Sequence, residues 1–373
     1  MINQDSLVAT FLELCRMNTP ARTEARVADY LQERLEALGA TCARDNTTDQ
    51  TGSNTGNVIA TFPGNVPDAP ALFLAAHMDT VEPNPNVQIL VEDGVIKSDG
   101  RTILGADDRA GIAPIVEALR VIQENDLPHG PIQAVFTVCE EIGLLGAKAL
   151  DTSLLKAQFG YVLDSGPPVG SIVNEAPSQD SLHITVKGRP AHAGAEPEKG
   201  ISAIQIAARA IDHMRLGRLD HETTANVGAI HGGNATNIVC PEVVLTAEAR
   251  SRDPRKLQAQ VQHMIEAFHE AAADFGGTVD IEIEHQYDAY RHSEHSPVVA
   301  LAIRAVQRTH REPVLKAVGG GSDANVFNAR GLPAVVLGTA MKAVHTHDEH
   351  ASLEDLCGTA EVIVALIQEA SGR

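Results

Sequence analysis

The sequence predicts an α/β protein with a mainly parallel sheet and a second, smaller domain inserted into it. Short apolar runs that end in polar residues alternate with amphipathic helical patterns, as in a parallel sheet flanked by helices. Between residues 178 and 290 the order of elements changes to β-α-β-β-α-β, which is typical of a ferredoxin-like sandwich. At 373 residues, the chain also exceeds the length that one hydrophobic core usually serves.

The first domain is predicted to comprise residues 1–177 and 291–373. A helix is expected over residues 23–39, because apolar residues recur on one face of it and Gly39 ends the pattern. The remaining elements follow from apolar runs of strand length and from helical periodicity. The expected strands lie at 71–79, 132–141, 160–166 and 333–338, and the expected helices at 110–125 and 354–370.

The inserted domain is predicted over residues 178–290. Its strands alternate apolar and polar residues, and its two helices each present one apolar face. The strands are expected at 181–188, 225–233, 242–251 and 278–286, and the helices at 200–214 and 255–277.

Composition excludes some classes of partner. With 49 acidic and 29 basic residues the formal net charge is −20, which repels nucleic acid. No stretch reaches the roughly 18 apolar residues that a membrane span needs, and the first twenty residues do not resemble a signal peptide. The five cysteines are scattered without a CxxC pair, which favours reduced thiols. We therefore expect a cytoplasmic protein that binds neither nucleic acid nor membrane.

Polar residues gather where three of the predicted strands end: His77 and Asp79, Glu140 and Glu141, and Asp164. Such positions face the site in a parallel α/β sheet. His77 and Asp79 are two apart and leave the same face, so one can bind a metal ion while the other orients it. Taken alone, a strand-end pair of this kind is more often a surface or capping pair.

Two further carboxylate pairs have alternative interpretations. In "GADDRAG", Asp107 and Asp108 open a predicted helix, where capping is the simpler interpretation of the motif alone. In "CEEIG", one of Glu140 and Glu141 can bind metal while the other acts as a general base, although such pairs are also common at solvated helix starts. Together, two imidazoles and several carboxylates suit Zn²⁺, and two ions with a bridging water would attack an amide near neutral pH.

The chain resembles the di-zinc peptidases and deacylases that include peptidase T, carboxypeptidase G, acetylornithine deacetylase and succinyl-diaminopimelate desuccinylase. Nine motifs occur in the order found in this family, over residues 77–356, and "ATNIV" and "GGGSDANVF" are most similar to the peptidase T-like branch. The motifs are "HMDTV", "GADDRAG", "CEEIGLLGA", "LDSG", "GRPAHAGAEPEKGISAI", "GGNATNIV", "EARS", "GGGSDANVFNARGLPAVVLG" and "HTHDEHASLEDL".

The resemblance implies a zinc-exopeptidase catalytic domain with an inserted lid and dimerisation domain, and hence a homodimer. It implies hydrolysis of short peptides by a tripeptide aminopeptidase; the alternative is an N-acyl amino-acid deacylase or a dipeptidase or carboxypeptidase with the same centre. Two Zn²⁺ ions per subunit are implied, with Co²⁺ or Mn²⁺ as alternatives. The implied ligands are His77 and Asp164 on one ion, Glu141 and His345 on the other, and Asp107 between them.

The same resemblance assigns the remaining roles. Asp79 would orient His77, and Glu140 would deprotonate a metal-bridging water and then protonate the leaving nitrogen. Within "HTHDEH" the match selects His345 and leaves His347 and His350 as solvated residues.

Substrate contacts are implied for four residues. His192 would polarise the scissile carbonyl in a neighbouring subunit. Taken alone, it would be interpreted as a histidine in a surface loop. Asn237 and Arg250 would hold the substrate carboxylate, and Ser322 would lie near the substrate beside the glycines at 319–321. Arg252, in contrast, is expected to be a solvated charge.

Two other classes of protein fit the sequence less well. "HTHDEH" is one residue from the HxHxDH motif of metallo-β-lactamase-like hydrolases, but only 28 residues follow His345, and the further ligands of that fold are missing from them. A binding module with a dead site would lack Glu140 or Asp107, and both are present.

Overall fold

The computed structural model describes residues 1–372, and the chain divides into two compact units. Unit 1 comprises Met1–Asn174, Arg291–Ala317 and Ser322–Arg373. Unit 2 comprises Glu175–Tyr290 and Val318–Gly321. Unit 2 therefore begins three residues before the predicted insertion at 178 and takes in a second, short segment that the sequence did not suggest.

Unit 1 contains most of the elements, and two strands, β8 and β14, extend across its boundary with unit 2. Its helices are α1 (Gln4–Cys15), α2 (Ala25–Ala37), α3 (Thr48–Thr51), α4 (Ala106–Glu124), α5 (Leu145–Ala149), α8 (Pro297–Arg308), α9 (Asp323–Ala329) and α10 (Leu353–Ala370). Its strands are β1 (Thr41–Arg44), β2 (Val58–Phe62), β3 (Leu72–His77), β4 (Ile89–Glu92), β5 (Val95–Ser98), β6 (Ile132–Thr137), β7 (Phe159–Ser165), β8 (Ser171–Ala176), β14 (Tyr290–Arg291), β15 (Val314–Ala317), β16 (Ala334–Gly338), β17 (Met341–Lys342) and β18 (His350–Ser352).

The main sheet of unit 1 has nine strands in the order β1-β2-β6-β3-β7-β16-β8-β14, with β15 paired to β8. The four central strands, from β6 to β16, run parallel to one another. The pairs β1-β2, β2-β6 and β16-β8 are antiparallel. The predicted mainly parallel sheet is thus confirmed for the centre, and its outer pairs reverse direction.

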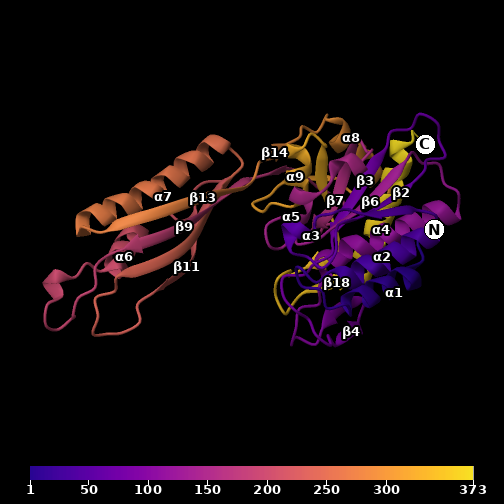
Figure 1. Ribbon diagram of the computed structural model, residues 1–373. Helices are drawn as coiled ribbons and strands as arrows, with labels where there is room; N and C mark the ends of the chain where they lie inside the picture. Colours follow the sequence, from indigo (N-terminus) through magenta and orange to yellow (C-terminus); the bar gives the residue numbers. More distant parts are fainter. Residues whose placement is uncertain (373) are drawn as a thin grey trace. The chain divides into compact units, whose positions relative to one another are not determined.

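Helices cover the central sheet of unit 1 (Figure 1). Every residue of β3 and β6 is buried, so both faces of these strands are covered, as expected for parallel strands with continuous apolar runs. Helix α4 packs against β3 and β7, α2 against β1 and β2, and α8 and α9 against β16. This packing fixes the strand ends at which the candidate site residues lie.

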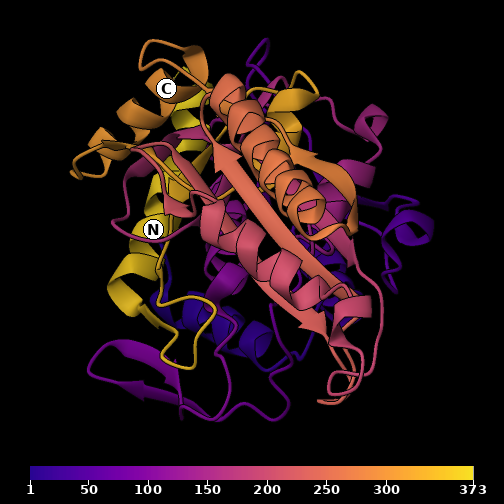
Figure 2. The same ribbon diagram turned by 90° about the vertical axis from the view of Figure 1, so that its left-hand side faces the viewer.

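Unit 2 is a five-stranded antiparallel sheet with two helices. The sheet has the order β10-β11-β12-β9-β13, and α6 and α7 lie side by side on one of its faces (Figures 1 and 2). Along β9, Leu182, Ile184 and Val186 are buried toward the helices, which is the alternation expected of a sheet with one covered face. The ferredoxin-like prediction is confirmed, with β10 as an added two-residue strand. The elements are β9 (Ser178–Lys187), α6 (Ala203–His213), β10 (Gly217–Arg218), β11 (Thr223–Gly232), β12 (Glu242–Ser251), α7 (Pro254–Phe275) and β13 (Thr278–Tyr287).

No helix within residues 1–372 combines the length and the apolar character that crossing a bilayer requires.

Candidate metal centre

Three neighbouring strands bring the predicted residues to one edge of the sheet in unit 1. His77 is the last residue of β3, Glu140 and Glu141 follow β6 within four residues, and Asp164 lies next to the last position of β7. Strand β3 pairs with both β6 and β7. The parallel direction of the three strands therefore makes these side chains converge.

Asp107 reaches this edge from the start of α4. Glu349 lies 242 residues further along the chain, yet its Oε1 accepts the N–H of Asp107 at 3.0 Å and its Oε2 accepts the N–H of Gly105 at 2.6 Å. The helix assigned as α4 follows Gly105, but Asp107 and Asp108 within it have non-helical φ and ψ values. The side chains of both aspartates are engaged elsewhere, because Asp107 contacts His77 and His345 and Asp108 accepts the N–H of His77 at 3.3 Å, which does not support capping as their role. The peptide bond between these two residues is cis.

The carboxylate of Asp107 lies between two histidines. Its Oδ1 is 3.0 Å from Nε2 of His77, and its Oδ2 is 3.2 Å from Nε2 of His345. The same nitrogen of His345 is 3.3 Å from Oε1 of Glu141. One carboxylate thus presents one oxygen to each imidazole, the arrangement that a bridging ligand needs.

The predicted ligands form two groups that share Asp107. Ligand atoms of His77, Asp107 and Asp164 lie within 4.8 Å of one another, and so do those of Asp107, Glu141 and His345. A third group joins His77 to Glu140 and Glu141. The structure therefore brings all five predicted ligands, and the predicted base, into one cluster.

The charges of the cluster fit divalent cations. Burial raises the pKa of Asp164 and of Glu140 well above the usual values, and neighbouring carboxylates raise both further. Burial alone would raise the pKa of Asp107, but the hydrogen bonds with His345 and His77 outweigh it and lower this pKa. The cluster contains more carboxylates than imidazoles, and burial disfavours the charged form of two of them, so N and O ligands that suit Zn²⁺ lie where a cation would stabilise the charged carboxylates.

The histidines respond to these carboxylates in the opposite sense. Hydrogen bonds with Asp107 and Glu141 raise the pKa of His345 to about 10. Burial would lower the pKa of His77, but hydrogen bonds with Asp107 and Asp79 raise it well above its usual value. Metal binding at these imidazoles would therefore displace protons.

Asp79 contacts His77 through its backbone. Nδ1 of His77 lies 3.1 Å from the carbonyl oxygen of Asp79 and 3.5 Å from its Oδ1. The carboxylate of Asp79 accepts the N–H groups of Glu140 and Glu141 at 3.0 and 3.1 Å. Asp79 thus connects a ligand on β3 with the two glutamates that follow β6.

Asp323 is a buried neighbour of the cluster that the sequence reasoning missed. It is the first residue of α9; its Oδ2 accepts the hydroxyl of Thr137 at 2.5 Å, and its Oδ1 has no hydrogen-bond partner within residues 1–372. Burial raises its pKa to about 6. Asp323 directly follows the predicted Ser322, and this position could have indicated it from the sequence. An aspartate at the start of a helix, however, usually caps the helix.

His192 and Asn237 lie together in unit 2. An isolated bridge pairs His192 with Ile238, and the N–H of Ala193 donates to the carbonyl oxygen of Asn237 at 2.9 Å. Nδ1 of His192 accepts the N–H groups of Gly194 and Ala195, which leaves Nε2 of this exposed side chain as the nitrogen that can carry the proton.

The other predicted substrate residues have partners within their own units. Both arms of the Arg250 guanidinium donate to Glu248, at 3.0 and 2.9 Å. Ser322 caps α9 and accepts the N–H of Ala324 at 3.3 Å.

The expectation for Arg252 was wrong. Its side chain is only 11% exposed and forms an ion pair with Glu175 at 2.9 Å. It also donates to the carbonyl oxygen of His221 at 3.0 Å, so it is a structural cation of unit 2.

The two remaining histidines of "HTHDEH" lie outside the cluster. Nε2 of His347 is 3.0 Å from Glu82, and its side chain is half exposed. Nδ1 of His350 lies 2.8 Å from the carbonyl oxygen of Asp348. Neither residue belongs to the groups of potential metal ligands.

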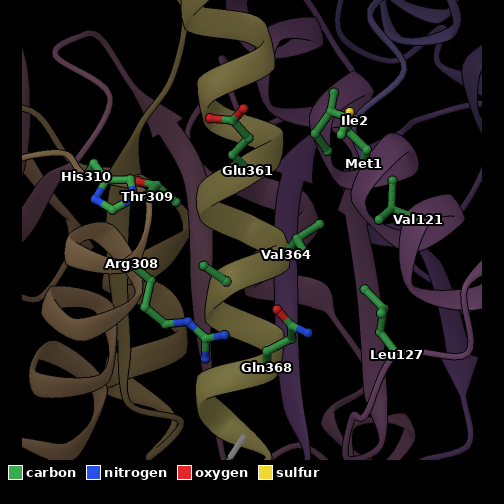
Figure 3. A pocket seen from close by; sticks show the side chains of 11 residues that line it. Met1, Ile2, Val121, Leu127, Arg308, Thr309, His310, Glu361, Val364 and Gln368 are labelled. Carbon is green, nitrogen blue, oxygen red and sulfur yellow. The ribbon is translucent and has the colours of Figure 1, made fainter.

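Two other places in the chain contain a hollow or a group of acidic side chains. A hollow of about 400 Å³ in unit 1 is lined along α10 by Glu361, Val364 and Gln368, and none of its lining residues is a candidate ligand (Figure 3). In unit 2, Asp220 and Glu222 lie close to His221, but Lys256 forms ion pairs with both acids at 2.9 and 2.7 Å. A cation therefore already occupies this second cluster.

Comparison with known proteins gives one family. Residues 73–369 match the model of peptidase family M20/M25/M40. Over 99% of both chains, the protein is 45% identical to the crystal structure of aminopeptidase PepT from Bacillus cereus, with a TM-score of 0.91. It is 40% identical to a tripeptidase structure from Staphylococcus aureus over the full length of both chains, with a TM-score of 0.96. Peptidase T of Escherichia coli is 28% identical over 98% of both chains.

Proposed function

The chain belongs to peptidase family M20/M25/M40, and on this premise we propose that it is a metal-dependent aminopeptidase that removes the first residue of short peptides, tripeptides among them. The similarity to an aminopeptidase and to a tripeptidase over almost the whole chain supports this substrate class. The observation that carries the proposal is the convergence of five ligand side chains on a cluster that also contains Glu140.

Five residues would hold the metal ions. His77 and Asp164 would bind one ion, Glu141 and His345 the other, and Asp107 would contribute one oxygen to each. When bound, two Zn²⁺ ions, or Co²⁺ or Mn²⁺ in their place, supply Lewis acidity for the scissile carbonyl and lower the pKa of water. Asp79 fixes the positions of His77 and the two glutamates through hydrogen bonds.

Glu140 is the general base of the proposed reaction. Burial and the carboxylates around it raise its pKa well above the usual value, and the positive charge of bound cations would oppose that shift. A carboxylate whose pKa is balanced by these two effects takes a proton from the attacking water and gives it to the leaving nitrogen as the amide C–N bond breaks.

Unit 2 would supply the substrate contacts and the dimer interface. The proton on Nε2 of His192 can donate to a carbonyl oxygen, and its exposure suits a role in the site of a neighbouring subunit. Asn237 lies beside it, and Arg250 of unit 2 and Ser322 of unit 1 are the further candidates for holding the peptide. The five unpaired cysteines favour the reducing cytoplasm as the location.

The test offers tripeptides, dipeptides and N-acyl amino acids to the zinc-loaded protein and to Glu140→Ala. Tripeptides should be hydrolysed fastest, with the N-terminal residue as the first product. Glu140→Ala should lower kcat by roughly 10²- to 10⁴-fold, because general acid–base catalysis is lost. The metal content of the variant should equal that of the wild type, since Glu140 is not assigned as a ligand.

Two outcomes would contradict the proposal in different ways. If Glu140→Ala hydrolyses peptides at the wild-type rate, Glu140 is not the base. If N-acyl amino acids are cleaved and tripeptides are not, the centre is a deacylase and the aminopeptidase assignment is wrong.

A further inference from the structure

The turn that carries Glu140 is held by side chains rather than by a strand. We call residues 138–141 the Glu140 turn. All four of its consecutive N–H groups donate to buried side-chain oxygens: Val138 to Asn57, Cys139 to Glu24, and Glu140 and Glu141 to Asp79, at distances of 3.0, 3.0, 3.0 and 3.1 Å. Each of the three acceptor residues is 0% exposed.

The backbone explains why side chains are needed here. Strand β6 ends at Thr137, and Cys139 adopts a positive φ of 53°. This left-handed conformation is unfavourable for a residue with a Cβ and occurs where the surroundings enforce it. Because the turn leaves the sheet, its N–H groups lose their ladder partners and would be unsatisfied in the core without these acceptors.

Glu24 is itself tightly held. Its Oε1 accepts the N–H of Arg22 at 2.9 Å, the N–H of Cys139 at 3.0 Å and the thiol of Cys139 at 3.3 Å. Its Oε2 accepts the hydroxyl of Ser53 at 2.5 Å. These donors come from three separate segments of the chain and are all uncharged, so they fix the carboxylate in place without an ion pair.

Asn57 ties the turn to the loop behind it. Its Oδ1 accepts the N–H of Val138, and its Nδ2 donates to the carbonyl oxygen of Gly146 at 2.9 Å and to Asp45 at 2.8 Å. Both ends of the segment from Val138 to Gly146 are therefore attached to one buried amide. The position of Glu140 within this segment depends on that attachment.

We propose that Glu24 and Asn57 are positioning residues for the reaction, which hold the Glu140 turn so that the carboxylate of Glu140 faces the attacking water and the leaving nitrogen. Neither residue touches the candidate ligands by a hydrogen bond in the part of the chain that the structure describes; both act through the backbone of the turn. A displacement of about 1 Å at a reacting group can lower a rate roughly 100-fold, so the effect should appear in kcat. The inference rests on the proposed function, because it requires Glu140 to be the base.

The experiment compares Glu24→Ala with Glu24→Gln in the metal-loaded, full-length protein, with the best tripeptide as substrate. Glu24→Ala should lower kcat by roughly 10- to 100-fold and change KM by less than about twofold. Glu24→Gln should recover most of kcat, because its amide oxygen can still accept the N–H of Cys139 while its NH₂ group donates to Ser53. Bound metal should be unchanged in both, since Asp79 still holds Glu141.

Glu117→Ala is the matched control. Glu117 is also a buried glutamate, 2% exposed, and its Oε1 accepts a backbone N–H, that of Asn3, at 2.6 Å. Its loss should lower thermal stability and leave kcat unchanged. Two further variants serve if Glu24→Ala does not fold. Glu24→Asp keeps the carboxylate but moves it away from the N–H of Cys139, and Asn57→Ala removes the acceptor of Val138. Each should lower kcat at constant KM.

Three results would overturn the inference. The first is that folded, metal-loaded Glu24→Ala has a kcat within about twofold of the wild type. The second is that Glu117→Ala loses as much kcat as Glu24→Ala, and the third is that Glu24→Ala is inactive because it has lost its metal. Glu140→Ala distinguishes a failure of this inference from a failure of the proposed function. If Glu140→Ala stays active, the proposed function fails; if it is inactive while Glu24→Ala is active, only the positioning role fails.

Discussion

At the scale of single residues, Glu349 determines where a candidate ligand lies. It is 1% exposed, and its two oxygens accept the N–H groups of Gly105 and Asp107, so the start of α4 is attached to the segment that carries His345. A buried acceptor of this kind stabilises the bridging position of Asp107 in the way that the outer hydrogen bonds of metal sites orient their ligands.

Glu349→Ala is therefore expected to weaken metal binding by roughly 10- to 100-fold. Competition with a chromophoric chelator measures the change in affinity. Glu354→Ala, which truncates an exposed glutamate in the first turn of α10, is the matched control and should bind metal like the wild type. Equal affinity in Glu349→Ala and the control would show that α4 holds Asp107 without Glu349.

The role of a residue could be predicted from the sequence where that residue lies in a motif. The five candidate ligands and Glu140 each lie in a recognisable stretch, and the parallel strands explain why His77, Asp164 and the two glutamates converge. Glu24 and Asn57 were not predictable, because their partners in the Glu140 turn lie 115 and 81 residues away and no local pattern links them. Arg252 was misjudged for the same reason, since its partner Glu175 is 77 residues distant.

At the scale of elements, β3 and β7 fit together through a glycine. Phe73 of β3 is paired in register with Gly160 of β7, and its ring also lies against that of Phe327, with a centroid distance of 4.7 Å. A Cβ added at Gly160 would come within 2.3 Å of the Phe73 ring. The bare backbone of Gly160 thus makes room for an aromatic ring four residues before Asp164.

Gly160→Ala should consequently lower the free energy of unfolding by about 1–3 kcal/mol, the usual cost of overpacking a core. Urea unfolding followed by circular dichroism measures it. In the background of Phe73→Leu the same change should cost less, because the ring is gone, and the two effects should not add. Gly228→Ala, another strand glycine, whose added Cβ would meet no atom nearer than 3.8 Å, is the control. Strict additivity would contradict this account.

Elements were predictable from the sequence in proportion to their length and burial. The fully buried strand β3 and the long helices α7 and α10 were expected within two residues of their observed bounds, whereas β6 ends four residues before the end of the expected strand. Strand β4, with three of its four residues exposed, lacks the apolar run that identifies a buried strand, and β17 and β18 have only two and three residues. The start of α4 was expected four residues late, because Asp107 and Asp108 have non-helical φ and ψ values.

At the scale of the whole molecule, the proposed dimer makes a prediction about mixed subunits. If His192 serves the site of a neighbouring subunit, Glu140→Ala and His192→Ala should each be inactive as homodimers. A mixed dimer would then combine the intact Glu140 of one subunit with the intact His192 of the other. Equal mixing of the two variants should restore roughly a quarter of the wild-type activity, because half of the dimers are mixed and each has one complete site.

The mixing experiment is read by peptide hydrolysis after the subunits have been exchanged, with the molecular mass measured in parallel. His192→Ala must retain its metal, since loss of metal would make His192 a ligand instead. If the mixture stays inactive although mixed dimers form, His192 acts within its own subunit.

The position of β16 has a consequence for synthesis of the chain. β16 pairs with both β7 and β8 in the main sheet, although more than 150 residues, including all of β9 to β13, separate it from them in the sequence. On the ribosome, the segment from β9 to β13 is complete before β16 emerges, so unit 2 can fold while the sheet of unit 1 still has a gap. His345 follows β16, so this candidate ligand is synthesised after the whole of unit 2 and after the strand that fills the gap. Nascent chains that end before His345 therefore lack one of the five candidate ligands.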